Sequence, residues 1–335
     1  MPPHFKFIFV LSNHFTAEDA RPVAQAIQHY KPHAVSIENS TQRESRRKID
    51  EAVWNHGGGT KGWASHEFKI EVLDVMARHR IPFKQLEFYP DQIATNRARI
   101  HSGAIEPAGT EAGEAICRGD LAAALAVQRR ILELRRKTNE GRHEQMVANA
   151  NVIAKEILEE HPELGRESEI RILVQIGRAH KDIAKDFRRA GLDAEVVHTH
   201  WPYVPAPYSG ITLLKSPIDD ELVGHATIFT MLQNHFSNIP TNSTKIELVA
   251  ESIARTVSQK DLPQLFQRLA EMAKRFKNAK MDFNVPDALT VMGEWFRGRG
   301  ITVPESKEEL EAYSKKLAPD SKFGLFSEKE MEKKS

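Results

Sequence analysis

The sequence has little cysteine and no excess of charge of either sign. Cys117 is the single cysteine, which excludes an intramolecular disulfide framework and a cysteine-rich zinc ribbon. It lies in a predicted helix without a cysteine-centred motif, so we interpret it as a small core residue. The 47 Lys and Arg residues balance 46 Asp and Glu residues, and this net charge of +1 offers no field for a polyanion. We therefore expect no nucleic-acid partner.

Long apolar runs and a serine-nucleophile motif are also missing. No stretch approaches the roughly 20 apolar residues that span a bilayer, and the apolar run before His14 is too short for a secretory signal. We expect a cytoplasmic protein with no membrane partner. A G-x-S-x-G elbow is absent, which argues against an ordinary serine hydrolase. What remains, with 40% hydrophobic and 28% charged residues, is typical of a globular protein with a sizeable core.

The N-terminal part alternates apolar strands with amphipathic helices. Strands are predicted over residues 4–11, 33–38, 82–87, 169–177 and 194–197, with helices between them over 16–30, 42–56, 65–80 and up to 190. Two of these segments have strand–helix–strand order, which favours parallel strand pairs with right-handed crossovers. We therefore predict an α/β fold with a central, mostly parallel sheet flanked by helices.

The character of the sequence changes after the last predicted strand. Residues 91–164 and 216–317 are predicted to be helical, and the final residues mix charges without a core pattern. We predict three parts: an α/β domain over 1–204, a helical C-terminal region over 205–317 that forms a lid or a subdomain, and a disordered tail over 318–335. The sequence does not define the oligomeric state.

The best-defined amphipathic helix begins at Arg142. Its apolar stripe recurs at spacings of four, three and four residues through Met146, Ala150, Ile153 and Ile157. Arg142 lies one turn earlier on the same stripe. A guanidinium group is therefore predicted on the buried side of the helix.

Polar residues follow the apolar strands at the point where ligands bind to open parallel sheets. Four strands end in this way, with His14, Glu38, Glu87 and His180. Imidazole and carboxylate together suit zinc, manganese, cobalt or iron, and they also suit proton transfer without a metal. The spacing does not distinguish these two possibilities. His198 and His200, after the last strand, are second-rank candidates for the same site.

These residues resemble the layout of the superfamily that includes the erythromycin esterases, the ChaN haem-binding lipoproteins, the TraB/PrgY proteins and the Tiki peptidases. Residues 177–180 match its second G-x-x-H motif, and His14 and Glu38 stand where its first histidine and first acid stand. Arg142, ahead of Met146, resembles the arginine of its R-[ND]-x-x-M helix. The resemblance covers about the first 200 residues.

Three positions differ from the family pattern. The chain has Leu11 where the family has glycine in its first motif, and His143 where Asn or Asp is usual. Phe88 follows Glu87, where a Tiki- or TraB-like chain often has Asp-Arg.

The resemblance implies a hydrolase of an ester or amide bond with a small-molecule or peptide substrate. In the metal-dependent version, His14, Glu38 and His180 hold one divalent ion (Zn, Mn or Co) that activates a bound water, and Arg142 stabilises the oxyanion. In the metal-free version, His14 or His180 is the general base and a carboxylate orients it. Glu87 is a further catalytic candidate.

The alternative is a catalytically silent protein of the same fold that binds a ligand or a partner. Leu11, in place of the first glycine, favours this alternative. The retained histidines, acids and arginine favour the enzyme.

Overall fold

The computed structural model describes most of the chain in two units. The described residues are 3–12, 17–37, 41–42, 67–90, 103–177, 180, 182–201, 217–236, 239–241, 243–319 and 322–332. The sheet unit comprises residues 1–99, 139–205 and 320–335, and the helical unit comprises residues 100–138 and 206–319. This division differs from the predicted one, because residues 100–138 belong with the C-terminal helices and the chain from residue 320 belongs with the sheet.

The sheet unit contains a five-stranded mixed sheet in the order β2-β5-β1-β6-β7. The strands are β1 (His4–Ser12), β2 (Ala34–Ile37), β5 (Glu169–Gly177), β6 (Asp193–Trp201) and β7 (Lys322–Ser327). The first four are parallel and β7 is antiparallel to β6. The predicted α/β fold with a mostly parallel sheet is therefore confirmed. A separate parallel pair is formed by β3 (Thr41–Gln42) and β4 (Phe88–Tyr89).

The two strand–helix–strand segments are interleaved rather than adjacent. β5 lies between β1 and β2, and β1 lies between β5 and β6, so the favoured pairing within each segment is wrong. β1 and β5 instead pair along nine residues, from His4 opposite Glu169 to Ser12 opposite Gly177. The last six residues of each are buried, and central positions suit such strands because both of their faces are covered.

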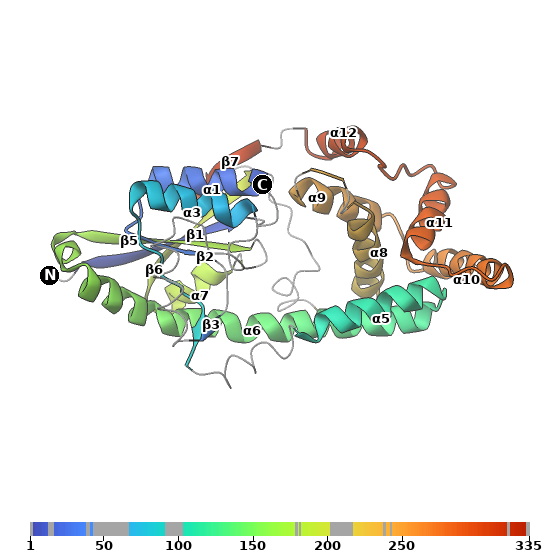
Figure 1. Ribbon diagram of the computed structural model, residues 1–335, viewed down its shortest axis with the longest axis horizontal. Helices are drawn as coiled ribbons and strands as arrows, with labels where there is room; N and C mark the ends of the chain where they lie inside the picture. Colours follow the sequence, from blue (N-terminus) through green and yellow to red (C-terminus); the bar gives the residue numbers. More distant parts are fainter. Residues whose placement is uncertain are drawn as a thin grey trace. The chain divides into compact units, whose positions relative to one another are not determined.

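Helices cover both faces of this sheet (Figure 1): α1 (Ala17–Tyr30), α3 (Glu67–His79), α6 (Leu121–Glu160) and α7 (Ile183–Arg189). Alternate residues of β1 point to opposite faces. Phe7 and Phe9 share one core with α7 and the C-terminal half of α6, whereas Ile8 and Val10 share another with α1 and α3. The polar groups described below are carried by α6, by α7 and by the segments that adjoin them.

The apolar stripe predicted on α6 is confirmed. Met146, Ala150, Ile153 and Ile157 are all buried in the core beneath the sheet. A short 3₁₀ helix, η1 (Pro162–Arg166), then leads into β5.

The strand predicted over residues 82–87 is reduced to one bridge, between Phe83 and Val35 of β2. The Val35 amide donates to Pro82 O (3.0 Å) and the Lys84 amide donates to Val35 O (2.8 Å). Further along, the Leu86 amide donates to the Ser36 hydroxyl (3.0 Å) instead of to a backbone carbonyl. A side chain thus replaces the next bond of the ladder and ends the pairing.

Two other predictions on local structure have different outcomes. The helix predicted over 42–56 lies outside the described residues, apart from Gln42, which belongs to β3. The tail predicted to be disordered instead forms β7, followed by α13 (Glu328–Glu332). β7 pairs with the exposed edge of β6, and Leu325 packs on the core of α1 and α3, which explains its order.

The helical unit surrounds a core of its own, which includes Phe229, Phe266 and Phe296. Besides the N-terminal half of α6, its helices are α5 (Ile105–Cys117), α8 (Asp220–Phe236), α9 (Ser243–Ala254), α10 (Leu262–Asn278), α11 (Val285–Arg297) and α12 (Lys307–Leu317). Gly119 turns the chain between α5 and α6 at a φ of +66°, and a Cβ there would lie 2.3 Å from Ala270 N, so only glycine fits. Across the described parts of both units, no helix has the length and apolar character that crossing a bilayer requires.

Candidate functional site

The structure brings together three of the five predicted site residues: Glu87, Arg142 and His180. They come from the segment before β4, from α6, and from the connection between β5 and α7. His14 and Glu38 lie outside the described residues. The second-rank candidates, His198 and His200, belong to β6, where they stand opposite Phe326 and Phe323 of β7.

Glu87 and Arg142 form a bidentate ion pair. Arg142 Nε donates to Glu87 Oε1 (2.9 Å) and Arg142 Nη2 donates to Glu87 Oε2 (2.7 Å). The Glu87 side chain is 2% exposed and that of Arg142 is 16% exposed. The Tyr89 hydroxyl also donates to Glu87 Oε1 (3.3 Å). These two parallel bonds between planar groups, which we call the fork, fix the orientation of both side chains. A lysine at position 142 could not form them.

Asn149 holds the backbone around Glu87 against α6. Its Nδ2 atom donates to the carbonyl oxygens of Leu86 and Phe88, each at 2.9 Å. Asn149 follows Arg142 by seven residues, which is two helical turns, so both project from the same face of α6. One helix face therefore anchors the carbonyl groups of the residues before and after Glu87 and supplies the guanidinium that pairs with it.

The His180 imidazole is held at both of its nitrogens by two consecutive residues of α6. Arg142 Nη1 lies 3.2 Å from His180 Nε2, and His143 Nε2 lies 2.9 Å from His180 Nδ1. His143 Nδ1 in turn lies 2.7 Å from Asp186 Oδ2. A continuous chain of hydrogen bonds thus joins Glu87, Arg142, His180, His143 and Asp186, and we call it the relay.

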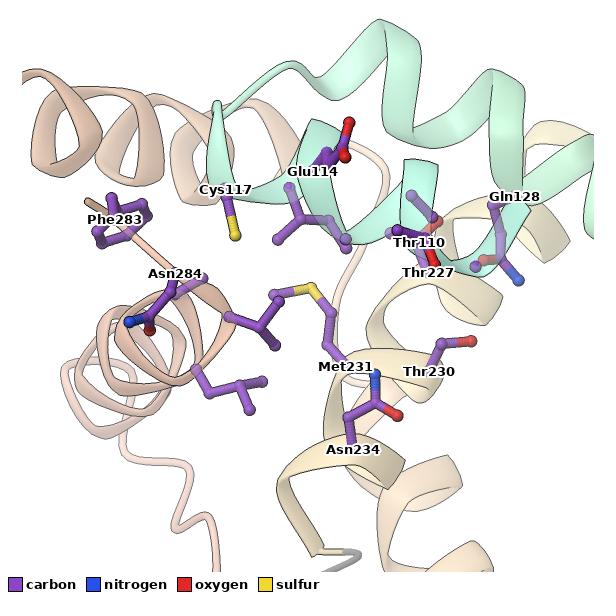
Figure 2. Close-up of a pocket in the computed structure, with 17 residues that line it drawn as sticks. Thr110, Glu114, Cys117, Gln128, Thr227, Thr230, Met231, Asn234, Phe283 and Asn284 are labelled. Carbon is purple, nitrogen blue, oxygen red and sulfur yellow. The ribbon is translucent and has the colours of Figure 1, made fainter. Parts of the chain in front are cut away.

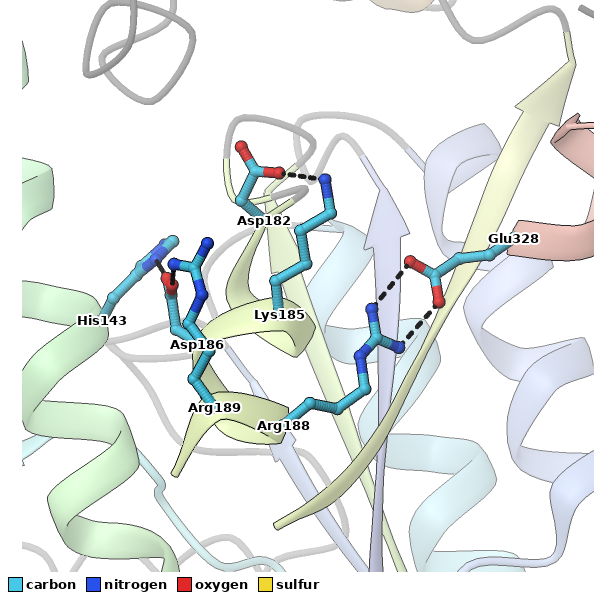
Figure 3. Close-up of polar contacts among 7 residues, drawn as sticks. All are labelled: His143, Asp182, Lys185, Asp186, Arg188, Arg189 and Glu328. Carbon is cyan, nitrogen blue, oxygen red and sulfur yellow. Dashed lines mark hydrogen bonds and ion pairs between the residues drawn. The ribbon is translucent and has the colours of Figure 1, made fainter. Parts of the chain in front are cut away.

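Ion pairs on both sides of α7 hold the end of the relay in place (Figure 3). Asp186 Oδ1 accepts a bond from Arg189 Nη1 (3.2 Å), so both of its carboxylate oxygens are engaged. Arg188 points the other way and donates to both carboxylate oxygens of Glu328 in α13 (2.9 and 3.3 Å). Phe187, between them, is fully buried against β1. The position of Asp186 is therefore set by packing as well as by charge.

The direction of every hydrogen bond in the relay follows from the chemistry of arginine. A guanidinium group only donates, so His180 Nε2 must accept with its lone pair. His180 then carries its proton on Nδ1 and donates it to His143 Nε2. His143 in turn carries its proton on Nδ1 and donates it to Asp186. Both histidines are thus neutral and share one tautomer.

The environment of His143 agrees with a neutral imidazole. Burial, together with the positive charge that His180 and Arg142 would present, lowers the pKa of His143 from 6.5 to about 4. The hydrogen bond and the charge of Asp186 act in the opposite direction but are outweighed. His143 therefore transmits a hydrogen bond at neutral pH without carrying a charge.

Sequence reasoning missed His143 and Asp186. His143 stood out only as a departure from the family pattern, beside an arginine on an apolar stripe. Asp186 carries no sequence signal, because an acid between Lys185 and Arg188 on a short helix is also typical of a solvated helix face. The relay depends on a contact between α6 and α7 that spacing along the chain does not reveal.

The predicted metal site has one described member, His180, and both ring nitrogens of that residue are hydrogen-bonded within the protein. An ion at Nε2 would lie against the Arg142 guanidinium, and like charges in a buried place are unfavourable. Within the described ranges, no group of three or more His, Cys, Asp or Glu residues could hold a metal ion. The site of His14, Glu38 and His180 stays a prediction.

Comparison with known proteins identifies no relative: no family model, no curated protein and no solved structure matches this chain.

The buried ion pair gives a first prediction. Arg142→Leu leaves the Glu87 carboxylate buried without its partner and should lower the free energy of unfolding by about 3–5 kcal/mol. The double variant Arg142→Leu/Glu87→Leu should lose clearly less than the sum of the two single variants, as measured by urea denaturation. Lys155→Ala on the same helix, which removes an exposed pair with Glu159, is the control and should cost below about 1 kcal/mol. Additive losses would show that the pair is not coupled.

The pKa of His143 gives a second prediction. Below pH 6.5 the unfolded chain binds a proton at this residue, whereas the folded protein does so only below about pH 4. Protons therefore bind preferentially to the unfolded chain as the pH falls, and the free energy of unfolding decreases. Stability should decrease over that window by up to about 3 kcal/mol. His143→Gln, which cannot titrate, should remove this part of the pH dependence in denaturation curves measured at several pH values. Equal slopes in variant and wild type would contradict the prediction.

Proposed function

We propose that this chain is a hydrolase of an ester or amide bond in a small molecule or peptide, with His180 as the general base. The observation that carries the proposal is the position of the His180 Nε2 lone pair, 3.2 Å from the Arg142 guanidinium. Acyl transfer needs a base and a positive group at one point. The resemblance to the erythromycin esterase and Tiki superfamily supports the same activity. Glu87, Arg142 and His180 come from three distant parts of the chain, and they lie within hydrogen-bond distance of one another.

The relay supplies the orientation that a general base needs. His180 Nε2 removes a proton from the attacking water, whose oxygen bonds to the substrate carbonyl carbon. The new positive charge on His180 is stabilised through His143 by the Asp186 carboxylate. When the intermediate collapses, the proton passes from His180 to the departing alcohol or amine. Asp186 and His143 act through His180 and are therefore positioning residues.

Arg142 is placed to stabilise the oxyanion. Two of its N–H groups are committed to Glu87, which holds the guanidinium in place, so that an Nη1 N–H group can exchange its bond with His180 for one with the substrate oxygen. Arg142 is more exposed than Glu87, to which it is paired. The substrate would therefore approach from the guanidinium side.

We favour the metal-free version of this hydrolase. His180 would supply one ligand in the metal-dependent version, together with His14 and Glu38. Its Nε2 atom accepts a hydrogen bond from Arg142 and its Nδ1 atom donates one to His143, an arrangement that suits proton transfer better than coordination.

A catalytically silent binding protein is the second candidate. His180 and His143 are both buried, and every hydrogen bond of the relay joins two groups of the protein itself. This favours the second candidate, because no group of the relay needs a substrate to complete its hydrogen bonds. A network of this kind also rigidifies a core without any reaction.

Hydrolysis of p-nitrophenyl esters and of peptide p-nitroanilides tests the proposal. His180→Ala should lower kcat/KM by about 10²–10⁴-fold, because it removes the general base. Asp186→Asn should lower kcat with little change in KM and should alter the pH profile, because it acts only on the orientation and charge of His180. Arg142→Lys, which keeps the charge but loses the fork, should lower kcat as well.

The controls separate the two candidates. Lys155→Ala should leave the rates unchanged, and circular dichroism should show that each variant is folded. Full activity in folded His180→Ala would exclude the proposed base. Absence of hydrolysis in the wild type, with and without added zinc, manganese or cobalt, would favour the binding protein.

A further inference from the structure

The helical unit contains a pocket that shares no residue with the relay. It has a volume of about 410 Å³ and lies among α5, α6, α8, α11 and the segment that precedes α11 (Figure 2). This volume is within the range of about 300–1,000 Å³ that small-molecule sites occupy. The pocket is therefore large enough for a small-molecule ligand.

The wall of the pocket is mostly apolar, with a polar group at one side. Apolar side chains from three helices line it, among them Ile116, Met231 and Leu289. Gln128 of α6 and Thr230 of α8 lie toward one side in Figure 2, and Cys117, Phe283 and Asn284 lie toward the other, where the Asn284 Oδ1 atom already accepts the Asp287 amide. The pocket would thus accommodate an apolar body and would offer hydrogen bonds to one end of it.

The pocket offers almost no charge to a ligand. Glu114 is the single charged residue among those that line it. Its side chain is 64% exposed and lies 3.6 Å from Arg118, so it belongs to the solvated rim. With no basic residue in the described lining, a carboxylate or phosphate would lose its hydration without gaining a partner. A neutral ligand is therefore favoured over a fatty acid or a nucleotide.

A glycine in the middle of a helix lies in the wall of the pocket. Gly113 lies in the middle of α5 and lines the pocket, and its φ is not positive. A Cβ there would meet only Val285 Cγ2, at 3.7 Å, which is an ordinary contact. Glycine is a poor helix former, and neither the backbone conformation nor a close contact requires it at this position. A larger side chain here would occupy space that is now part of the pocket.

We propose that this pocket binds a neutral, largely apolar small molecule whose uncharged polar end, an amide, hydroxyl or ketone, meets Gln128 and Thr230. The proposal is independent of the hydrolase, because the pocket and the relay belong to different units.

Cys117 provides a reporter for this pocket in the unmodified chain. It is the single cysteine of the sequence and lines the pocket (Figure 2). Its thiol is partly buried, and burial raises its pKa, so labelling is slow but measurable. A molecule in the pocket would shield this sulfur.

The test compares octanamide with octanoate, which share a chain length and differ in charge at neutral pH. The rate of Cys117 alkylation by N-ethylmaleimide, followed by mass spectrometry of the full chain, is the readout. Octanamide should slow labelling in a saturable way, about tenfold at a concentration about ten times its Kd, with one molecule bound per chain by calorimetry. Octanoate should give no protection at the same concentrations.

Two helix glycines supply matched variants. Gly113→Leu extends a side chain across the pocket and should abolish both binding and protection. Gly293→Leu adds the same side chain in α11, where a Cβ meets nothing within 4 Å and the pocket is not lined, and should leave both unchanged. The proposal is overturned if octanamide shows no saturable protection, if octanoate protects equally, or if Gly113→Leu still binds octanamide as the wild type does.

Discussion

The guanidinium of Arg142 can donate hydrogen bonds but cannot accept them, and the order of the relay depends on this constraint. It turns the lone pair of His180 toward Arg142, and each later bond toward Asp186 then has a single possible direction. The fork also fixes Glu87, whose backbone Asn149 holds from the same helix face. α6 can impose this order because its apolar stripe is buried against the sheet over the same turns.

The distribution of charge explains how so many polar groups are buried together. Formal charges lie at the ends of the relay, where Glu87 is paired with Arg142 and Asp186 is paired with Arg189. The two histidines between these pairs are neutral, so no buried charge is left without a partner. The same arrangement could accept one proton at His180, because Asp186 lies one imidazole away. The relay, whose hydrogen bonds all lie within the protein, therefore also allows His180 to act as a general base.

Strand periodicity predicted the α/β sheet, and the rule that ligands bind at strand ends placed Glu87 and His180 in one candidate site. The apolar stripe of α6 predicted that Arg142 lies on the buried side of its helix, and the family resemblance added Arg142 to that site. Local patterns were sufficient for Arg142 and His180, because α6 carries the first and the second follows β5, whereas Glu87 is held by Asn149 and Arg142 of α6. The interleaved order of β1 and β5 was not predictable in this way, because it depends on pairing between strands 165 residues apart in register. Asp186 was missed for the same reason, since its partner His143 lies 43 residues away on another helix.

Long-range ¹H–¹⁵N correlation spectra of the histidine side chains test the relay most directly. The signals of His143 and His180 can be assigned by comparison with His143→Gln and His180→Gln. We expect both imidazoles to be neutral at neutral pH with the proton on Nδ1, and that of His143 to stay neutral down to about pH 4. A proton on Nε2 of His180, or an imidazolium at neutral pH in either residue, would contradict the hydrogen-bond direction that Arg142 imposes.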